Sequence, residues 1–133
     1  MKIFKRYIER KRKLGILNKF YKFIDDVGFE YEKVEKLSKI QRYAVLCFWY
    51  DAEMGSGGHS SYFNCYSNVL NEELEKALLE VSSKQIANNF MDAVKNGKKD
   101  DYEKSDNRYY EFSPSLDEYL EEYIFVNKDE ILK

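Results

Sequence analysis

His59 is the only histidine in the 133-residue sequence, and it is the side chain best suited to acid–base chemistry near neutral pH. Nucleophilic catalysis would need a serine or cysteine within hydrogen-bond reach of His59, and a third group that orients the ring. Candidates for both roles occur nearby in the chain: Ser56, Ser60, Ser61 and Cys65 as nucleophiles, Asp51 and Glu53 as orienting groups. One hypothesis is therefore a hydrolase or small-ligand site formed by neighbouring residues: Asp51, Glu53, Gly57, Gly58, His59, Ser61 and Tyr62.

A structural role for His59 competes with this hypothesis. Catalytic triads are defined by geometry rather than by closeness in the chain, and a lone histidine near a helix start also fits a packing position. We therefore assign no catalytic residue and favour a protein without enzymatic activity. No metal or cofactor is expected, because one histidine and two separated cysteines, Cys47 and Cys65, lack the spacing of a zinc site.

The glycine-rich segment Gly55-Ser56-Gly57-Gly58 directly precedes His59. A phosphate-binding loop has such glycines after a strand and before a helix, with a lysine in register. Here a helical pattern comes before the glycines and no lysine is near, so the segment predicts a tight turn between two helices. We expect Asp51 or Glu53 to accept hydrogen bonds from backbone amides of this turn.

The elements around this turn are predicted to be helices. Ser38 and Gln41 form a capping-box pattern, and the residues that follow are apolar nearly all round, which places that helix at the centre of the domain. Ser83 is predicted to cap one further helix and Asn71 another. The remaining predictions are a helix over 2–13 that Leu14-Gly15 weakens or ends, one over 16–27 ending at Gly28, a buried helix near 62–66, a loop over 98–107, and a last helix over 116–126 begun by Ser113-Pro114.

Strand signals are scarce, and no linker or repeat divides the chain. The prediction is an all-α fold, a compact single-domain bundle (1–133) of about six or seven helices, with a basic N-terminal helix (1–13) and a core over 38–127. Hydrophobic residues make up 44% and charged residues 35%, as in ordinary globular proteins. The chain shows neither a signal-peptide pattern nor 18 consecutive apolar residues, so we expect it in the cytoplasm.

Charge is distributed unevenly along the chain. Residues 1–13 hold seven Lys or Arg and one Glu, whereas residues 71–133 hold nine basic and sixteen acidic residues. The basic segment could contact phosphates or anionic lipid, but no groove-reading motif accompanies it, so neither direct nucleic-acid binding nor a membrane is favoured. The acidic half offers candidates for a protein interface, against which a merely solvated face competes: Asp100, Asp101, Glu111, Asp117, Glu118, Glu121 and Glu122.

The segment from Ala52 to Asn64 resembles the signature of a bacterial family of small helical domains of unknown function that includes a DNA-mimic protein. The family signature is Glu, two variable residues, Asn-Gly-Gly, then Gln, aromatic residues and Asn. Glu53, Gly57-Gly58 and Tyr62-Phe63 match it, Ser56 and Ser61 stand where Asn and Gln are usual, and Asn64 comes one place early. The resemblance, which extends over about 38–127, implies an all-α fold and, where a role is described, binding through an acidic surface.

Together these observations predict a bacterial, protein-binding helical domain, of DNA-mimic or immunity/inhibitor type, that acts through its acidic surface. Its partner would be a basic or DNA-binding protein, and the domain itself a monomer or a homodimer. The alternative is the hydrolase or small-ligand site around the glycine-rich turn and His59.

Overall fold

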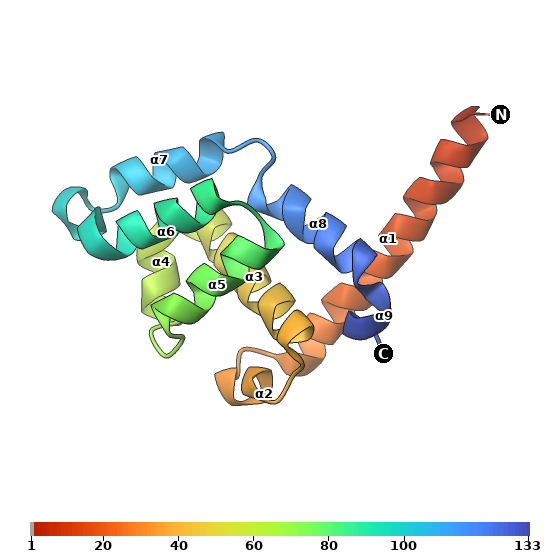
Figure 1. The fold of residues 1–133 in the computed structure, drawn as a ribbon, viewed down its shortest axis with the longest axis horizontal. Helices are drawn as coiled ribbons and strands as arrows, with labels where there is room; N and C mark the ends of the chain where they lie inside the picture. Colours follow the sequence, from red (N-terminus) through yellow and green to blue (C-terminus); the bar gives the residue numbers. More distant parts are fainter. Residues whose placement is uncertain (1) are drawn as a thin grey trace.

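Helix α3 (Lys39–Ser56) runs through the centre of the fold in the computed structural model, which describes residues 2–133 (Figure 1). Its predicted capping box is present: the Ser38 side chain accepts the backbone N–H of Gln41, and the Gln41 side chain accepts that of Ser38. Trp49 and Tyr50 are buried, as are most other residues of the helix, so it needs neighbours on nearly every side. Helices α4, α5, α8 and α9 provide them.

Residues 2–133 contain no strand, and the predicted all-α class is confirmed. Seven of the nine α-helices in this range have eight residues or more, in line with the predicted six or seven. Besides α3, the elements are α1 (Lys2–Val27), α2 (Tyr31–Glu35), α4 (Gly58–Cys65), α5 (Asn71–Val81), α6 (Lys84–Asn96), the 3-10 helix η1 (Gly97–Asp100), α7 (Glu103–Glu111), α8 (Leu116–Val126) and α9 (Lys128–Ile131).

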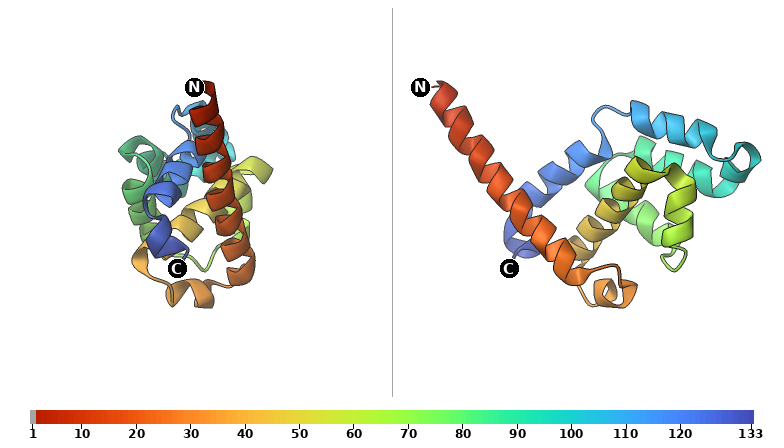
Figure 2. Two further views of the ribbon diagram at one scale, coloured as in Figure 1. Left: turned by 90° about the vertical axis from the view of Figure 1, so that its right-hand side faces the viewer. Right: turned by 180° about the vertical axis from the view of Figure 1, so that it is seen from behind.

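The structure corrects the prediction for the N-terminus, because α1 continues through Gly15 as one helix and ends at Gly28. A glycine inside a helix costs only about 1 kcal/mol, and packing of the C-terminal half of α1 outweighs that cost. Phe20, Ile24 and Val27 are buried there, and α1 contacts α8. The N-terminal half instead projects away from the other helices (Figures 1 and 2).

The predicted loop over 98–107 is wrong, because η1 and most of α7 occupy it. A single buried side, with Ser105 and Tyr109, is enough to hold α7, while four of its charged residues are exposed: Glu103, Lys104, Arg108 and Glu111. The predicted cap at Asn71 is also wrong, because Asn71 is the first residue of α5 and caps nothing. The predicted start signal Ser113-Pro114 lies before the helix, since α8 begins at Leu116 and is capped by Ser115, whose side chain accepts the N–H of Glu118.

Ser83 caps α6 as predicted, because its hydroxyl accepts the backbone N–H of Ile86. None of the helices among residues 2–133 has the length and apolar content needed to cross a lipid bilayer.

Candidate functional site

The turn between α3 and α4 is one residue long. Gly57 separates the two helices, and its N–H donates to the carbonyl of Glu53 at 2.9 Å. Gly58 follows with a φ of +76°, in the left-handed region that favours glycine. A Cβ on Gly58 would lie 2.8 Å from the carboxylate carbon of Asp106, closer than real side chains approach. The second glycine is therefore required both by the backbone and by the close approach of α7.

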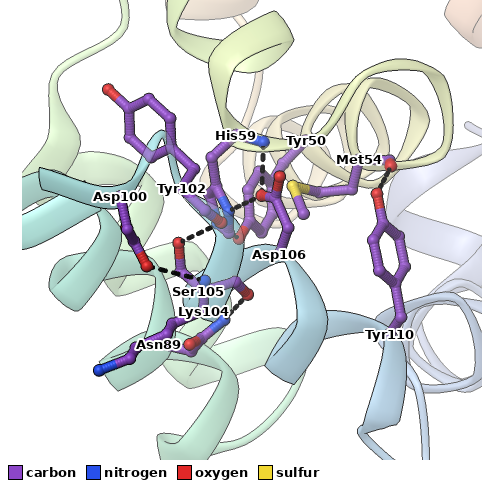
Figure 3. Close-up of polar contacts among 10 residues, drawn as sticks. All are labelled: Tyr50, Met54, His59, Asn89, Asp100, Tyr102, Lys104, Ser105, Asp106 and Tyr110. Atoms are coloured by element: carbon purple, nitrogen blue, oxygen red, sulfur yellow. Dashed lines mark hydrogen bonds and ion pairs between the residues drawn. The ribbon is translucent and has the colours of Figure 1, made fainter. Parts of the chain in front are cut away.

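His59, the next residue, joins three helices (Figure 3). Its Nε2 lies 2.6 Å from the hydroxyl oxygen of Tyr50 on α3. Its Nδ1 lies 2.7 Å from Oδ1 of Asp106 on α7, and its backbone N–H donates to the same oxygen at 2.9 Å. Because a carboxylate only accepts, Nδ1 carries the proton, which leaves Nε2 to accept the hydroxyl of Tyr50.

Aromatic rings enclose this polar chain. The rings of Phe63, Phe90 and Tyr102 lie within 6.4 Å of the imidazole, centre to centre, and the His59 side chain is 0% exposed. Burial lowers the pKa of His59 below its ordinary value, against the opposing effect of its hydrogen bond to Asp106. Burial also raises the pKa of Tyr50 well above the ordinary value. The pair is therefore neutral at physiological pH and out of reach of a dissolved substrate.

The prediction that Asp51 or Glu53 accepts hydrogen bonds from backbone amides of the turn is wrong. The turn amide of His59 is bound by Asp106, not by Asp51 or Glu53. Glu53 accepts the hydroxyl of Ser61 and so joins α3 to α4, while Asp51 accepts the hydroxyl of Tyr109 on α7. The physical reason is that helical side chains lean toward the N-terminus, away from a turn at the C-terminal end.

The predicted site residues therefore divide among separate contacts. His59 is hydrogen-bonded to Asp106, whose carboxylate lies close beside Gly58. Glu53 is hydrogen-bonded to Ser61, and Asp51 to Tyr109. Gly57 is exposed in the turn. Tyr62 is buried in the core, edge-on to Tyr50. The nucleophile–histidine pairing that a hydrolase would need is replaced by the bonds of Ser61 to Glu53 and of His59 to Tyr50 and Asp106.

The acidic candidates also divide into two groups. Asp100 and Asp101 lie at the η1–α7 end, where Asp100 accepts the backbone N–H of Lys104 and shares a shallow pocket with Lys99 and Arg108. Glu111 is exposed at the end of α7. The other four form what we call the α8 row, four exposed carboxylates in a helix without a basic residue: Asp117, Glu118, Glu121 and Glu122.

A groove of about 250 Å³ lies between the α8 row and α1. Its walls combine apolar side chains with carboxylates: Ile16, Leu17, Phe125, Glu118, Glu121 and Glu122, together with the ammonium group of Lys13. Burial and then the neighbouring Asp117 raise the pKa of Glu121, and Lys13 acts in the opposite direction. The groove is suited to an apolar side chain accompanied by a cation. Within residues 2–133 no three His, Cys, Asp or Glu side chains are placed to hold a metal ion.

Residues 35–131, more than two thirds of the chain, match the family model of DMP19-like proteins. The chain belongs to the DMP19-like family. The matched region of this DMP19-like protein contains the α3–α4 turn, His59, Asp106 and the α8 row, whereas the whole of α1 precedes it. No curated protein and no solved structure matches the chain.

The sequence alone did not identify Tyr50 and Asp106 as the hydrogen-bond partners of His59, or Tyr109 as the partner of Asp51. Asp106 and Tyr109 lie in and beside the charged stretch predicted as a loop. The signal that could have found them is the helical spacing of Tyr102, Ser105 and Tyr109, which gives that stretch one buried side. Nothing local indicates that this side faces His59.

Proposed function

We propose that this domain is a non-catalytic binding module that engages a basic protein, such as a DNA-binding protein, through the α8 row. The observation that carries the proposal is the concentration of four exposed carboxylates on α8, a helix that has no basic residue of its own. A charge-complementary partner would be steered to such a surface and held in register on it.

The α8 row is rigidly supported. Leu116, Leu120 and Ile124 of the same helix are buried against the core, so the opposite side of α8 carries the carboxylates. Residues four apart on a helix lie about 6 Å apart along its axis, and the row therefore presents regularly spaced negative charges. In a complex with a DNA-binding protein these carboxylates would take the places of phosphates, which is the inhibitor or DNA-mimic role that the family resemblance suggests.

The fully buried position of His59 supports a non-catalytic role. General acid–base catalysis requires the group to come within hydrogen-bond reach of the substrate, and both ring nitrogens of His59 are already bound within the core. We infer that the Tyr50–His59–Asp106 chain holds α3, α4 and α7 together, and that binding occurs on the surface.

Affinity capture from the native host's lysate at low salt tests the proposal. We expect a basic partner that is released as salt rises, because screening weakens contacts between exposed charges. The double variant Glu118→Lys/Glu121→Lys should lose this partner. The matched control Glu32→Lys/Glu35→Lys makes the same charge change on exposed residues of α2 and should keep it. Equal capture by the two variants would contradict the proposal.

A further inference from the structure

A basic groove of about 560 Å³ lies between α1 and the α9 region, which are neighbours in the fold (Figure 1). Five of the side chains that line it are basic: Lys11, Arg12, Lys19, Lys128 and Lys133. The other lining residues are the acidic Asp129 and the uncharged Gly15, Ile16 and Leu132. The volume is in the range of small-ligand sites, roughly 300–1,000 Å³. We call this site the α1–α9 groove, and it shares only Ile16 with the groove beside the α8 row.

The positive charge of the α1–α9 groove is not neutralised by neighbouring carboxylates. Four of its five basic side chains have no ion-pair partner among residues 2–133: Lys11, Arg12, Lys19 and Lys128. The fifth, Lys133, lies 3.5 Å from Glu130. The ammonium group of Lys11 instead lies 4.9 Å from the ring centre of Tyr7, a contact that leaves its charge in place. With one carboxylate against these cations, the groove attracts an anion that carries several charges.

The cations stand on two walls of the groove. At 100° per residue, Lys11, Arg12 and Lys19 fall within a sector of about 100° of α1, and they extend over about 12 Å along its axis. Lys128 stands on the α9 wall. Cations that face one another across a groove of this volume suit a short row of linked phosphates, whose oxygens accept charge-assisted hydrogen bonds from Lys and Arg.

Gly15 keeps the wall formed by α1 low. It lies one turn after Lys11 and one turn before Lys19, so the three residues follow one another in a single row along the helix. Glycine is unfavourable inside a helix, and a Cβ at Gly15 would meet nothing within 4 Å. A larger side chain there would fill the space between the two lysines. Glycine instead lets a ligand approach the backbone of α1 closely.

We propose that the α1–α9 groove binds the diphosphate or triphosphate group of a small molecule. Arg12 can bind two phosphate oxygens at once, whereas the lysines act as point charges. Ile16 and Leu132 provide apolar surface for an uncharged part of the ligand. A nucleoside polyphosphate and an inorganic polyphosphate share this chemistry.

This site is independent of the proposed function, because none of its residues belongs to the α8 row. Membership of the family does not imply it either. The wall formed by α1 precedes residues 35–131, the region that matches the family model. A partner on the α8 row and a phosphorylated ligand in the α1–α9 groove would occupy different surfaces of the chain.

Isothermal titration calorimetry of the full chain tests the proposal, at low salt and without added divalent cations. The probes are orthophosphate, inorganic triphosphate and ATP. We expect one triphosphate per chain, bound at least about tenfold more tightly than orthophosphate, because more of the cations are then in contact with phosphate. Tighter binding of ATP than of triphosphate would identify a nucleotide as the ligand. Equal binding of the two would identify an inorganic polyphosphate.

A charge reversal tests whether the groove itself binds the phosphates. Arg12→Glu should weaken triphosphate binding about tenfold or more. Arg10→Glu is the matched control, because Arg10 is also exposed in α1 and lies about 160° around the helix from Arg12. It makes the same change in net charge and should weaken binding less than about threefold.

A change of shape without a change of charge tests the role of Gly15. Gly15→Leu should fill the groove and weaken triphosphate binding about tenfold, and Gly15→Ala, with its much smaller side chain, should keep most of the affinity. Both changes favour the helix, so the unfolding temperature should be at least that of the unchanged protein in each case. Loss of folding therefore cannot explain the loss of binding.

Three results would overturn the proposal. The first is the absence of saturable triphosphate binding. The second is an equal loss of affinity in Arg12→Glu and Arg10→Glu, which would show attraction by the net charge of α1 rather than by the groove. The third is a duplex oligonucleotide that displaces triphosphate and binds Gly15→Leu as tightly as the unchanged protein, which would assign the basic side chains to a nucleic acid.

Discussion

Asp106 and His59 are joined twice through one oxygen atom, because Oδ1 of Asp106 lies 2.7 Å from Nδ1 of His59 and also accepts its backbone N–H. The two residues are 47 positions apart in the chain, so this contact closes α7 onto the α3–α4 turn. The approach is possible only because Gly58 has no side chain where the Asp106 carboxylate lies. The glycine turn, the histidine and the aspartate thus form one structural unit.

Replacing Asp106 with alanine should destabilise the fold strongly. The change leaves the backbone N–H of His59 and its Nδ1–H without an acceptor in a buried position, at a cost of about 3 kcal/mol. Urea unfolding followed by circular dichroism measures the loss. Asp92→Ala is the control, because Asp92 forms a surface ion pair with Arg108, and it should cost less than about 1 kcal/mol. Equal effects of the two changes would contradict a special role for Asp106.

Gly58, which begins α4, and Gly55, near the end of α3, should respond in opposite directions to alanine. Gly58→Ala places a Cβ against the Asp106 carboxylate at a φ of +76°, and we expect a loss of at least about 2 kcal/mol. Gly55 lies within α3, and a Cβ there meets nothing within 4 Å. Gly55→Ala should therefore raise the free energy of unfolding by about 0.5–1 kcal/mol. Thermal and urea unfolding of both variants decide the point.

Features determined by nearby residues could be predicted from the sequence. The capping box of Ser38 and Gln41 and the cap at Ser83 depend on contacts three residues apart, and both are present. Helix α8, Leu116–Val126, has the bounds predicted for the last helix, because its apolar residues recur with helical spacing, although the short α9 follows it. The turn at Gly57-Gly58 was also predictable, since Gly58 has a φ of +76°, which glycine adopts more readily than other residue types.

The rest depends on contacts between distant parts of the chain. Gly15 alone indicates a helix end, and only the packing of the C-terminal half of α1 on α8 shows why the helix continues. Likewise, the charged composition of 98–107 indicates a loop, whereas the burial of Tyr109 beside Asp51 makes it a helix. The partner of His59 could not be chosen by proximity, because Asp51 and Glu53 are near in sequence and Asp106 is near in space.

The stability of the fold should decrease as pH falls below about 6.5. Burial lowers the pKa of His59 below its ordinary value of 6.5, so in that range the unfolded chain binds a proton that the folded chain does not. The free energy of unfolding therefore falls with pH between the two pKa values and is fully recovered above about 6.5. Burial acts oppositely on Asp51 and Glu121, whose raised pKa values favour the folded state as pH falls through the acid range.

The imidazole proton resonances of His59 separate these effects, because the chain has no other histidine. In the folded protein they should titrate below pH 6.5, and in urea close to it. A folded-state midpoint at or above 6.5 would contradict the burial of a neutral ring.

The two cysteines should differ sharply in reactivity. Cys47 is buried in α3, and burial raises the pKa of its thiol, whereas Cys65 is exposed at the end of α4. Because the thiolate is the reactive form, an aromatic disulfide reagent should modify one thiol per native chain quickly and the second only on unfolding. Cys65→Ser should abolish the fast reaction and leave the slow one. Fast modification of both thiols in the native protein would show that α3 is open to solvent and is not the centre of the fold.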